Sequence, residues 1–185
     1  PARNLGPRVG GDTAYFISVN RGKKSITLDI FSKEGKQAFL SLVPHFDVLV
    51  ENFVPGHMAR SGLDYGSIRQ VNPGLIYTSI SGFGQDGPEA RKPALDIVVQ
   101  AMGGMLSVTG EPNGPPVRPG ASLADSTAGV FGALAIVSAL YRRRETGQGQ
   151  HIDMSMLDCQ VTMLENAFSR FFATGQVPSP LGTRH

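Results

Sequence analysis

The sequence predicts an α/β protein in which helices flank a mainly parallel β-sheet. Three short segments, at residues 47–50, 74–81 and 151–154, are predicted to be strands, and the first is typical of a buried strand in a parallel sheet. Longer segments with apolar residues at helical spacing separate them. Because strands that alternate with helices form right-handed βαβ units, we expect parallel pairing. The architecture is therefore expected to be Rossmann-like, with ligands bound beyond the carboxyl ends of the strands.

Two further strands and a helix are predicted before the first of these segments. Residues 15–19 and 25–28 mix β-branched and aromatic side chains on either side of a basic turn at residues 20–24. A helix is predicted over residues 33–43, where apolar residues recur every three or four positions.

The rest of the sheet is expected to be surrounded by helices. Short helices are predicted at residues 57–60, 65–71 and 94–102, the last ended by Gly103-Gly104. Residues 105–119 are rich in Gly and Pro and are expected to form a loop with at most a short strand.

The two longest helices are predicted near the end of the chain. They cover residues 126–144 and 155–173, on either side of a turn at residues 146–149 and the last strand.

The composition is that of a folded globular protein. The chain has 185 residues, 41% hydrophobic and 17% charged, with a net charge of +2. It contains no long basic run that would favour nucleic acid, and no apolar run of about eighteen residues that would favour a membrane. The single cysteine, Cys159, cannot form an internal disulfide. We therefore expect a cytoplasmic protein, or a mitochondrial matrix protein if the source is eukaryotic.

Both ends of the sequence look like parts of a longer chain. Residues 1–11 are loop-like and lead into no obvious strand. Residues 178–185 are polar and rich in proline, as linkers are.

The common signatures of nucleotide and metal sites are missing. There is no GxxxxGK[ST] motif, and the GxGxxG match that begins at Gly82 is followed by Pro88 rather than by a helix. The four histidines are far apart in sequence and show no ligand spacing, so no metal site is expected. Cys159 lies within a helix among apolar neighbours, which favours core packing over catalysis.

A single carboxylate, Asp125, stands immediately before the helix predicted over residues 126–144. Asp is a preferred N-cap residue because its side-chain oxygen accepts an otherwise unpaired backbone N–H. The simplest interpretation is that Asp125 is a helix cap. The alternative is that the same carboxylate is a nucleophile, kept ionised by the helix N-terminus.

Asn52 and Phe53 follow a buried strand directly and precede a turn at Pro55-Gly56. An amide and a flat apolar ring held outward by such a turn suit an adenine ring with polar edges. Arg60 is close enough in sequence to contact a phosphate. Taken singly, each residue is more simply explained by turn chemistry or as a solvated helix charge.

Several separate motifs form one pattern when they are considered together. They lie, in order, at residues 20–29, 50–56, 79–88, 100–104, 123–125 and 146–158. The pattern covers nearly the whole chain and resembles the family III CoA-transferases, the group of the formyl-CoA and carnitine-CoA transferases and the α-methylacyl-CoA racemases.

The resemblance implies that Asp125 is the catalytic aspartate. It also implies a coenzyme A site, whose residues would be Leu28, Asp29, Ile30, Phe31, Asn52, Phe53, Val54, Arg60, Pro93, Ala94, Leu95 and Asp96, with Met156 at the wall of the active site. The family often has a basic residue where this chain has Pro93, and Lys92 is adjacent to that position.

One difference from the racemases bears on the reaction. The racemases have a histidine that removes the α-proton at the position of Leu95, and leucine cannot act as a base. The resemblance therefore favours CoA transfer from an acyl-CoA donor to a small carboxylic acid. Racemization and a non-catalytic CoA-binding module are the alternatives.

The mechanism expected from the resemblance passes through covalent intermediates on Asp125, an aspartyl–acyl anhydride and an aspartyl–CoA thioester. The backbone N–H groups of Gly103 and Gly104 are candidate oxyanion donors.

The resemblance also implies a chain about twice this length that forms interlocked homodimers. Residues 1–175 would then belong to the large CoA-binding domain, without its first strand. Residues 176–185 would begin a linker to a second, smaller domain.

Overall fold

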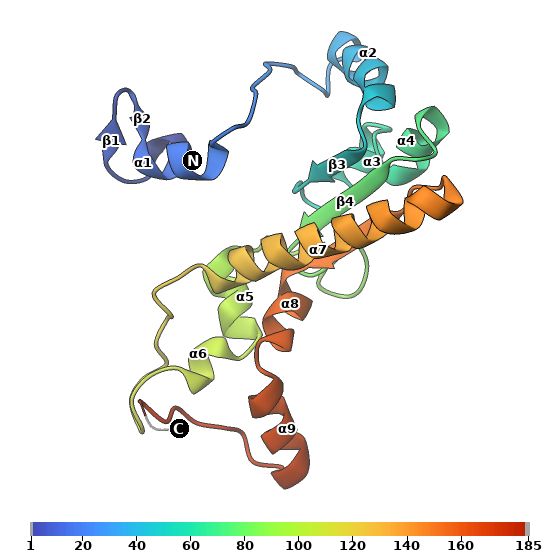
Figure 1. The fold of residues 1–185 in the computed structure, drawn as a ribbon. Helices are drawn as coiled ribbons and strands as arrows, with labels where there is room; N and C mark the ends of the chain where they lie inside the picture. Colours follow the sequence, from blue (N-terminus) through green and yellow to red (C-terminus); the bar gives the residue numbers. More distant parts are fainter. Residues whose placement is uncertain (1, 184–185) are drawn as a thin grey trace. The chain divides into compact units, whose positions relative to one another are not determined.

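The computed structural model describes residues 2–183 (Figure 1). The chain divides into two compact units, Pro1–Phe39 and Leu40–His185, and each is described by itself. Residues 184 and 185 of the predicted linker lie outside the described part.

The first unit contains short elements. A 3-10 turn (η1, Ala2–Asn4) precedes an antiparallel pair of two-residue strands, β1 (Arg8–Val9) and β2 (Asp12–Thr13), which lead directly into helix α1 (Ala14–Asn20).

The strands predicted at residues 15–19 and 25–28 are both wrong. Residues 15–19 lie in α1, which is capped because the Thr13 hydroxyl accepts the N–H of Phe16 at 3.1 Å. Residues 25–28 have no regular secondary structure. Since β propensity mainly reflects packing against neighbouring strands, a local cap and the lack of a paired strand outweigh it here.

Helix α2 (Lys33–Leu42) confirms the helix predicted over residues 33–43 and crosses the boundary between the units. A 3-10 turn, η2 (Val43–His45), follows it.

The second unit is built on the predicted parallel sheet. Its strands are β3 (Val48–Glu51), β4 (Ile76–Ser81) and β5 (His151–Ser155), in the order β3-β4-β5. All neighbouring strands are parallel. The three predicted strands are therefore confirmed, and their carboxyl ends lie at one edge of the sheet.

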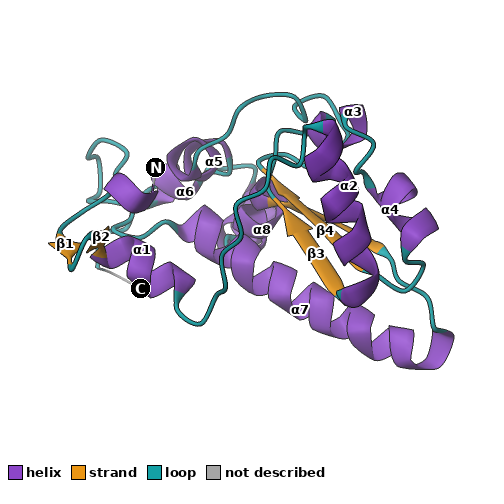
Figure 2. Ribbon diagram, turned by 90° about the horizontal axis from the view of Figure 1, so that it is seen from above, coloured by secondary structure: helices purple, strands orange, loops and turns teal. Residues whose placement is uncertain are grey.

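The central strand β4 is covered on both faces, as its side chains alternate. Ile76 packs with Ala139 of helix α7 (Leu123–Thr146) on one face. Tyr77 points to the other face, where its hydroxyl donates to the carbonyl of Leu63 at 2.9 Å. Figure 2 shows α7 running along the sheet. Both faces of β4 are buried, although Thr78, Ser79 and Ser81 place hydroxyl groups in the strand.

The remaining helices also follow the prediction in most places. Helices α3 (His57–Arg60), α4 (Tyr65–Val71) and α5 (Asp96–Met102) lie within one or two residues of the predicted bounds.

Two predictions in the second half of the chain are corrected. The loop predicted over residues 105–119 contains a short helix, α6 (Met105–Val108), which starts because Gly104 adopts the left-handed conformation. The final helix is broken into α8 (Met156–Thr162) and α9 (Glu165–Thr174), where the chain turns at Leu164 and buries its side chain.

Helix α7 is longer than the sequence pattern indicated. By length and apolar composition alone it could cross a membrane. One such helix is weak evidence, because a core helix passes the same test. Here α7 packs against β4, β5, α5 and α8.

Candidate active site at the start of helix α7

Asp125 lies in the first turn of α7, as its third residue, and is not the cap. The helix begins at Leu123, with Ser122 before it. The capping carboxylate comes instead from Asp96, the first residue of α5: its Oδ1 accepts the backbone N–H of Ala124 at 3.0 Å and that of Asp125 at 3.4 Å. The predicted cap role of Asp125 is therefore wrong, and Asp96 has that role.

The second oxygen of Asp96 is also bound. Oδ2 accepts the amide of Gln100 Nε2 at 2.6 Å and lies 3.8 Å from Nη2 of Arg118. Only 10% of the Asp96 side chain is exposed. Asp96 thus joins α5, the segment before α7, and the first turn of α7.

The electrostatic surroundings of Asp125 differ from those predicted. Asp125 is exposed as a residue, but partial burial of its carboxyl raises the pKa above its usual value, and the negative charge of Asp96 raises it further. The helix N-terminus was expected to favour the ionised form, but desolvation and a neighbouring carboxylate outweigh it.

A close contact at the end of β4 positions the segment that carries Asp96. A Cβ atom on Gly82 would overlap the Cβ of Ala94, so only glycine fits there. The carbonyl of Gly82 also accepts the N–H of Leu157, at the start of α8, at 3.0 Å. The end of β4 therefore supports both α5 and α8.

Several of the predicted site residues meet at this point. Ala94 packs against a buried cluster that includes Met156 and Ala124, the residue before Asp125. Pro93 and Leu95 are exposed, Leu95 with 70% of its surface accessible. The structure thus brings Ala94, Asp96, Asp125 and Met156 together.

Asn52 and Phe53 are fixed at the carboxyl end of β3. The amide Nδ2 of Asn52 donates to the carbonyl of Ile80 at 2.7 Å and ties the end of β3 to β4. The N–H of Phe53 donates to Glu51 Oε2 at 2.8 Å, and the Phe53 ring stacks on His57 at 5.4 Å between centroids. Nη2 of Arg60 lies 3.2 Å from Nδ1 of the same histidine.

A cavity of about 670 Å³ lies between the loops that follow β3 and β4. Val54 lines it from the loop after β3, Arg60 from the last residue of α3, and Arg91 from the loop after β4. The second loop is held by β5, because Asp153 Oδ2 accepts the N–H of Gln85 at 2.8 Å. Two guanidinium groups at the ends of parallel strands form a site suited to a phosphate group.

Arg91 was missed by the sequence analysis, which considered Lys92 at this place. Lys92 forms an ion pair with Glu89. In the described part of the chain, Arg91 has no hydrogen bond or ion pair and lines the cavity. The sequence gives no signal that distinguishes Arg91 from Lys92 as the residue that lines the cavity, because the path of the loop backbone determines which side chain faces it.

The predicted CoA residues Leu28, Asp29, Ile30 and Phe31 lie in the first unit. There Asp29 Oδ1 accepts the N–H of Phe31 at 3.1 Å and of Ser32 at 3.3 Å, which forms the turn into α2. The structure describes this turn separately from the site on the second unit.

The predicted oxyanion donors are wrong. The N–H of Gly103 donates to the carbonyl of Val99 at 2.8 Å, and that of Gly104 to Ala101 at 3.2 Å. Both groups are used to end α5.

The other candidate groups belong to the core. Cys159 is buried, with a pKa raised by burial and then by Asp158, as expected for a packed thiol. Among residues 2–183, no group of three or more His, Cys, Asp or Glu side chains is arranged to hold a metal ion.

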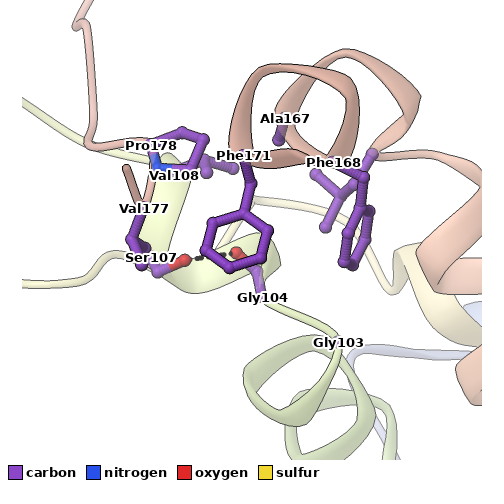
Figure 3. A pocket seen from close by; sticks show the side chains of 10 residues that line it. Gly103, Gly104, Ser107, Val108, Ala167, Phe168, Phe171, Val177 and Pro178 are labelled. Atoms are coloured by element: carbon purple, nitrogen blue, oxygen red, sulfur yellow. Dashed lines mark hydrogen bonds between the residues drawn. The ribbon is translucent and has the colours of Figure 1, made fainter. Parts of the chain in front are cut away.

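A second cavity, of about 230 Å³, lies between α6 and α9 (Figure 3). Its walls are apolar and include Phe168, Phe171, Val177 and Pro178. Ser107 is its one hydroxyl among the lining residues, and that hydroxyl donates to the carbonyl of Gly104 at 2.7 Å. This cavity offers no group for catalysis.

A parallel α/β unit with a carboxylate at a helix start and arginines beyond two strand ends has the layout of an enzyme that binds an anionic cofactor or cosubstrate. Residues 1–185 match CoA-transferase family III, and the chain belongs to that family. The predicted family is confirmed.

Named relatives support this assignment. The chain is 49% identical to the acetyl-CoA:oxalate CoA-transferase of Acetobacter aceti, over 99% of this chain and 47% of that protein. It is 44% identical to the succinate–glutarate CoA-transferase of Agrobacterium fabrum, over 93% of this chain and 43% of that protein. The human succinyl-CoA:glutarate CoA-transferase is 37% identical, over 97% of this chain and 41% of that protein.

A crystal structure of a CAIB/BAIF family protein from Brucella suis has the same fold. It superposes with a TM-score of 0.94 at 43% identity, over 100% of this chain and 50% of that chain. The chain therefore spans about half the length of the relatives it matches.

Proposed function

We propose that this protein transfers CoA from an acyl-CoA donor to a small carboxylic acid, with Asp125 as the nucleophile. The observation that carries the proposal is the position of Asp125. Asp125 lies at the start of α7, and its backbone N–H donates to Asp96. The chain that carries these residues belongs to a family of CoA-transferases.

The proposed reaction proceeds by acyl transfer at Asp125. A carboxylate oxygen of Asp125 attacks the thioester carbonyl, the C–S bond breaks, and an aspartyl–acyl anhydride and CoA thiolate form. The thiolate then attacks the aspartyl carbonyl and releases the donor acid, which leaves an aspartyl–CoA thioester. The acceptor carboxylate repeats these steps in reverse. Covalent catalysis of this kind replaces one difficult exchange by easier steps.

The acceptor is proposed to be a small dicarboxylic acid. The relatives are named for oxalate, for succinate and glutarate, and for mesaconate, all of which are dicarboxylates. Racemization is disfavoured because Leu95, exposed beside Asp96, offers no proton acceptor.

The cavity beyond β3 and β4 is proposed to bind the phosphate groups of CoA through Arg60 and Arg91. Asn52, Phe53 and Val54 would then contact the nucleotide, and residues 28–31 and 93–96 are retained as proposed CoA contacts.

Arg91→Gln is expected to weaken CoA binding about tenfold, because a charge-assisted hydrogen bond to phosphate is lost. Lys92→Gln removes the same charge one residue away and is expected to change binding less than twofold, about 0.4 kcal/mol. Isothermal titration of CoA into each full-length variant measures the difference. A larger loss for Lys92→Gln would show that Lys92 is the phosphate ligand.

The pH dependence of transfer is expected to report Asp125. The carboxylate must be ionised to attack, and its pKa is raised, so the acid limb of kcat/KM lies at higher pH than for an ordinary aspartate. Asp96→Asn keeps an oxygen for the backbone N–H groups but removes the repelling charge, so the acid limb moves to lower pH.

The matched control for this shift is Glu145→Gln, which removes an exposed charge at the other end of α7. It is expected to leave the acid limb in place. A limb that stays fixed in Asp96→Asn, or moves to higher pH, contradicts the assignment of this limb to Asp125.

We further propose a cytoplasmic homodimer in which the described chain belongs to the large domain. The outer face of α7 exposes Val130, Leu134, Val137 and Tyr141, which recur at helical spacing. Such an apolar stripe is typical of a surface that another part of an assembly covers. Light scattering of the full-length protein measures the oligomeric state.

A further inference from the structure

We infer that Arg118 binds the second carboxylate of a dicarboxylic acceptor acid. The inference rests on the proposed CoA transfer and assigns the residue that selects the acceptor at the same site.

Arg118 is a cation with unused hydrogen-bond donors. Its Nη2 lies 3.8 Å from Oδ2 of Asp96, which is longer than a hydrogen bond, and 53% of its side chain is exposed. In the part of the chain that the structure describes, Arg118 donates no hydrogen bond. The N–H donors in the plane of the guanidinium are therefore available for a ligand.

Asp96 does not depend on Arg118. Its two oxygens already accept hydrogen bonds from the Gln100 amide and from the backbone N–H groups of Ala124 and Asp125. An ion pair that is half exposed contributes little to stability. Arg118 can therefore leave Asp96 for a ligand carboxylate at little cost.

The position of Arg118 relates it to the nucleophile. The Asp96 carboxylate binds the N–H of Asp125 through Oδ1 and faces Arg118 through Oδ2. Arg118 and Asp125 therefore lie on the two sides of one carboxylate, and they are only seven positions apart in the sequence. An acid with one carboxylate at Asp125 has its second within the neighbourhood of Arg118.

The balance of charge requires a cation at this place. Asp96 and Asp125 are both acidic, and a dicarboxylate adds two more negative charges, which would repel one another in a partly desolvated site. Among residues 2–183, Arg118 is the basic side chain in ion-pair contact with Asp96, the carboxylate next to Asp125. Arginine also matches a carboxylate with two parallel hydrogen bonds.

The test compares acceptors that differ only in the second carboxylate. Full-length protein is assayed with acetyl-CoA as donor, and with succinate or glutarate against butyrate or valerate as acceptor. Arg118→Gln is expected to raise KM for the dicarboxylates about tenfold to a hundredfold and to leave KM for the monocarboxylates within about twofold. Arg118→Lys, which keeps the charge without the paired donors, is expected to lie between.

The matched control is Arg144→Gln, which removes an arginine nineteen residues after Asp125, about 28 Å along α7, and should change neither KM. An equal loss for both acceptor classes in Arg118→Gln would mean a structural role and would overturn the inference. If the ratio of the KM for dicarboxylates to the KM for monocarboxylates does not change in Arg118→Gln, the inference is overturned while the proposed transfer stands. The same holds if the wild-type protein prefers monocarboxylates. Failure of wild-type protein to transfer CoA to any of these acids would overturn the proposed function and the inference with it.

Discussion

Asp125→Ala in the full-length protein is expected to lower the rate of CoA transfer by at least about 10⁴-fold. The reason is chemical: without a carboxylate at the start of α7, neither the anhydride nor the thioester can form. The affinity for CoA is expected to change less than threefold, since the proposed phosphate ligands lie elsewhere, Arg60 at the end of α3 and Arg91 on the loop after β4.

Transfer is measured by following the new acyl-CoA chromatographically, and CoA binding by titration. Ser126→Ala is the matched control, because it changes the next residue, which is also exposed, without touching the carboxylate. Retained transfer in Asp125→Ala would refute the nucleophile assignment. A protein that binds CoA but transfers it to no acid in the wild-type form would be a non-catalytic CoA-binding module.

The second large effect is expected from Gly82→Ala. The added methyl group would overlap the Cβ of Ala94, which is bonded directly to backbone and cannot move alone. The segment that carries Asp96 must shift, and we expect a loss of about 1–3 kcal/mol in the free energy of unfolding. Because Asp96 binds the first turn of α7, transfer is expected to fall as well, through kcat more than KM.

Gly129→Ala is the control for this prediction, and it is expected to change stability in the opposite direction. A Cβ at Gly129 meets no atom within 4 Å, and the residue lies inside α7. Alanine should stabilise the helix by up to about 1 kcal/mol. Urea unfolding of both variants measures the two signs, and an unchanged unfolding midpoint in Gly82→Ala would contradict the predicted overlap.

The sequence predicted the second unit well because its signals are local. The β-branched residues of β3, β4 and β5 occur in short segments between helical patterns, and α4 is bounded by its own cap, Asp64, which accepts the N–H of Ser67. The strand predicted at residues 15–19 is wrong because the Thr13 cap, which starts a helix there, outweighs the β propensity of these residues.

The details of the candidate site could not be predicted because they depend on contacts between distant parts of the chain. The cap of α7 comes from Asp96, which lies 29 residues before Asp125. The choice between Arg91 and Lys92 depends on the path of a loop that Asp153 holds from another strand. A sequence shows that a carboxylate lies near the start of a helix, but it does not show which distant side chain accepts the first backbone N–H groups of that helix.

The carboxyl end of β4 has a consequence for the length of the ligand. Asn52 is tied to Ile80, and Ala94 rests against Gly82. The segment that leads to Arg60 and the segment that leads to Asp96 are therefore both anchored at residues 80–82, where β4 ends. The end of β4 therefore fixes the distance between the phosphate cavity and the nucleophile. If CoA binds as proposed, its pantetheine arm must span this distance. Analogues with a longer or shorter arm would then hold their sulfur out of reach of Asp125.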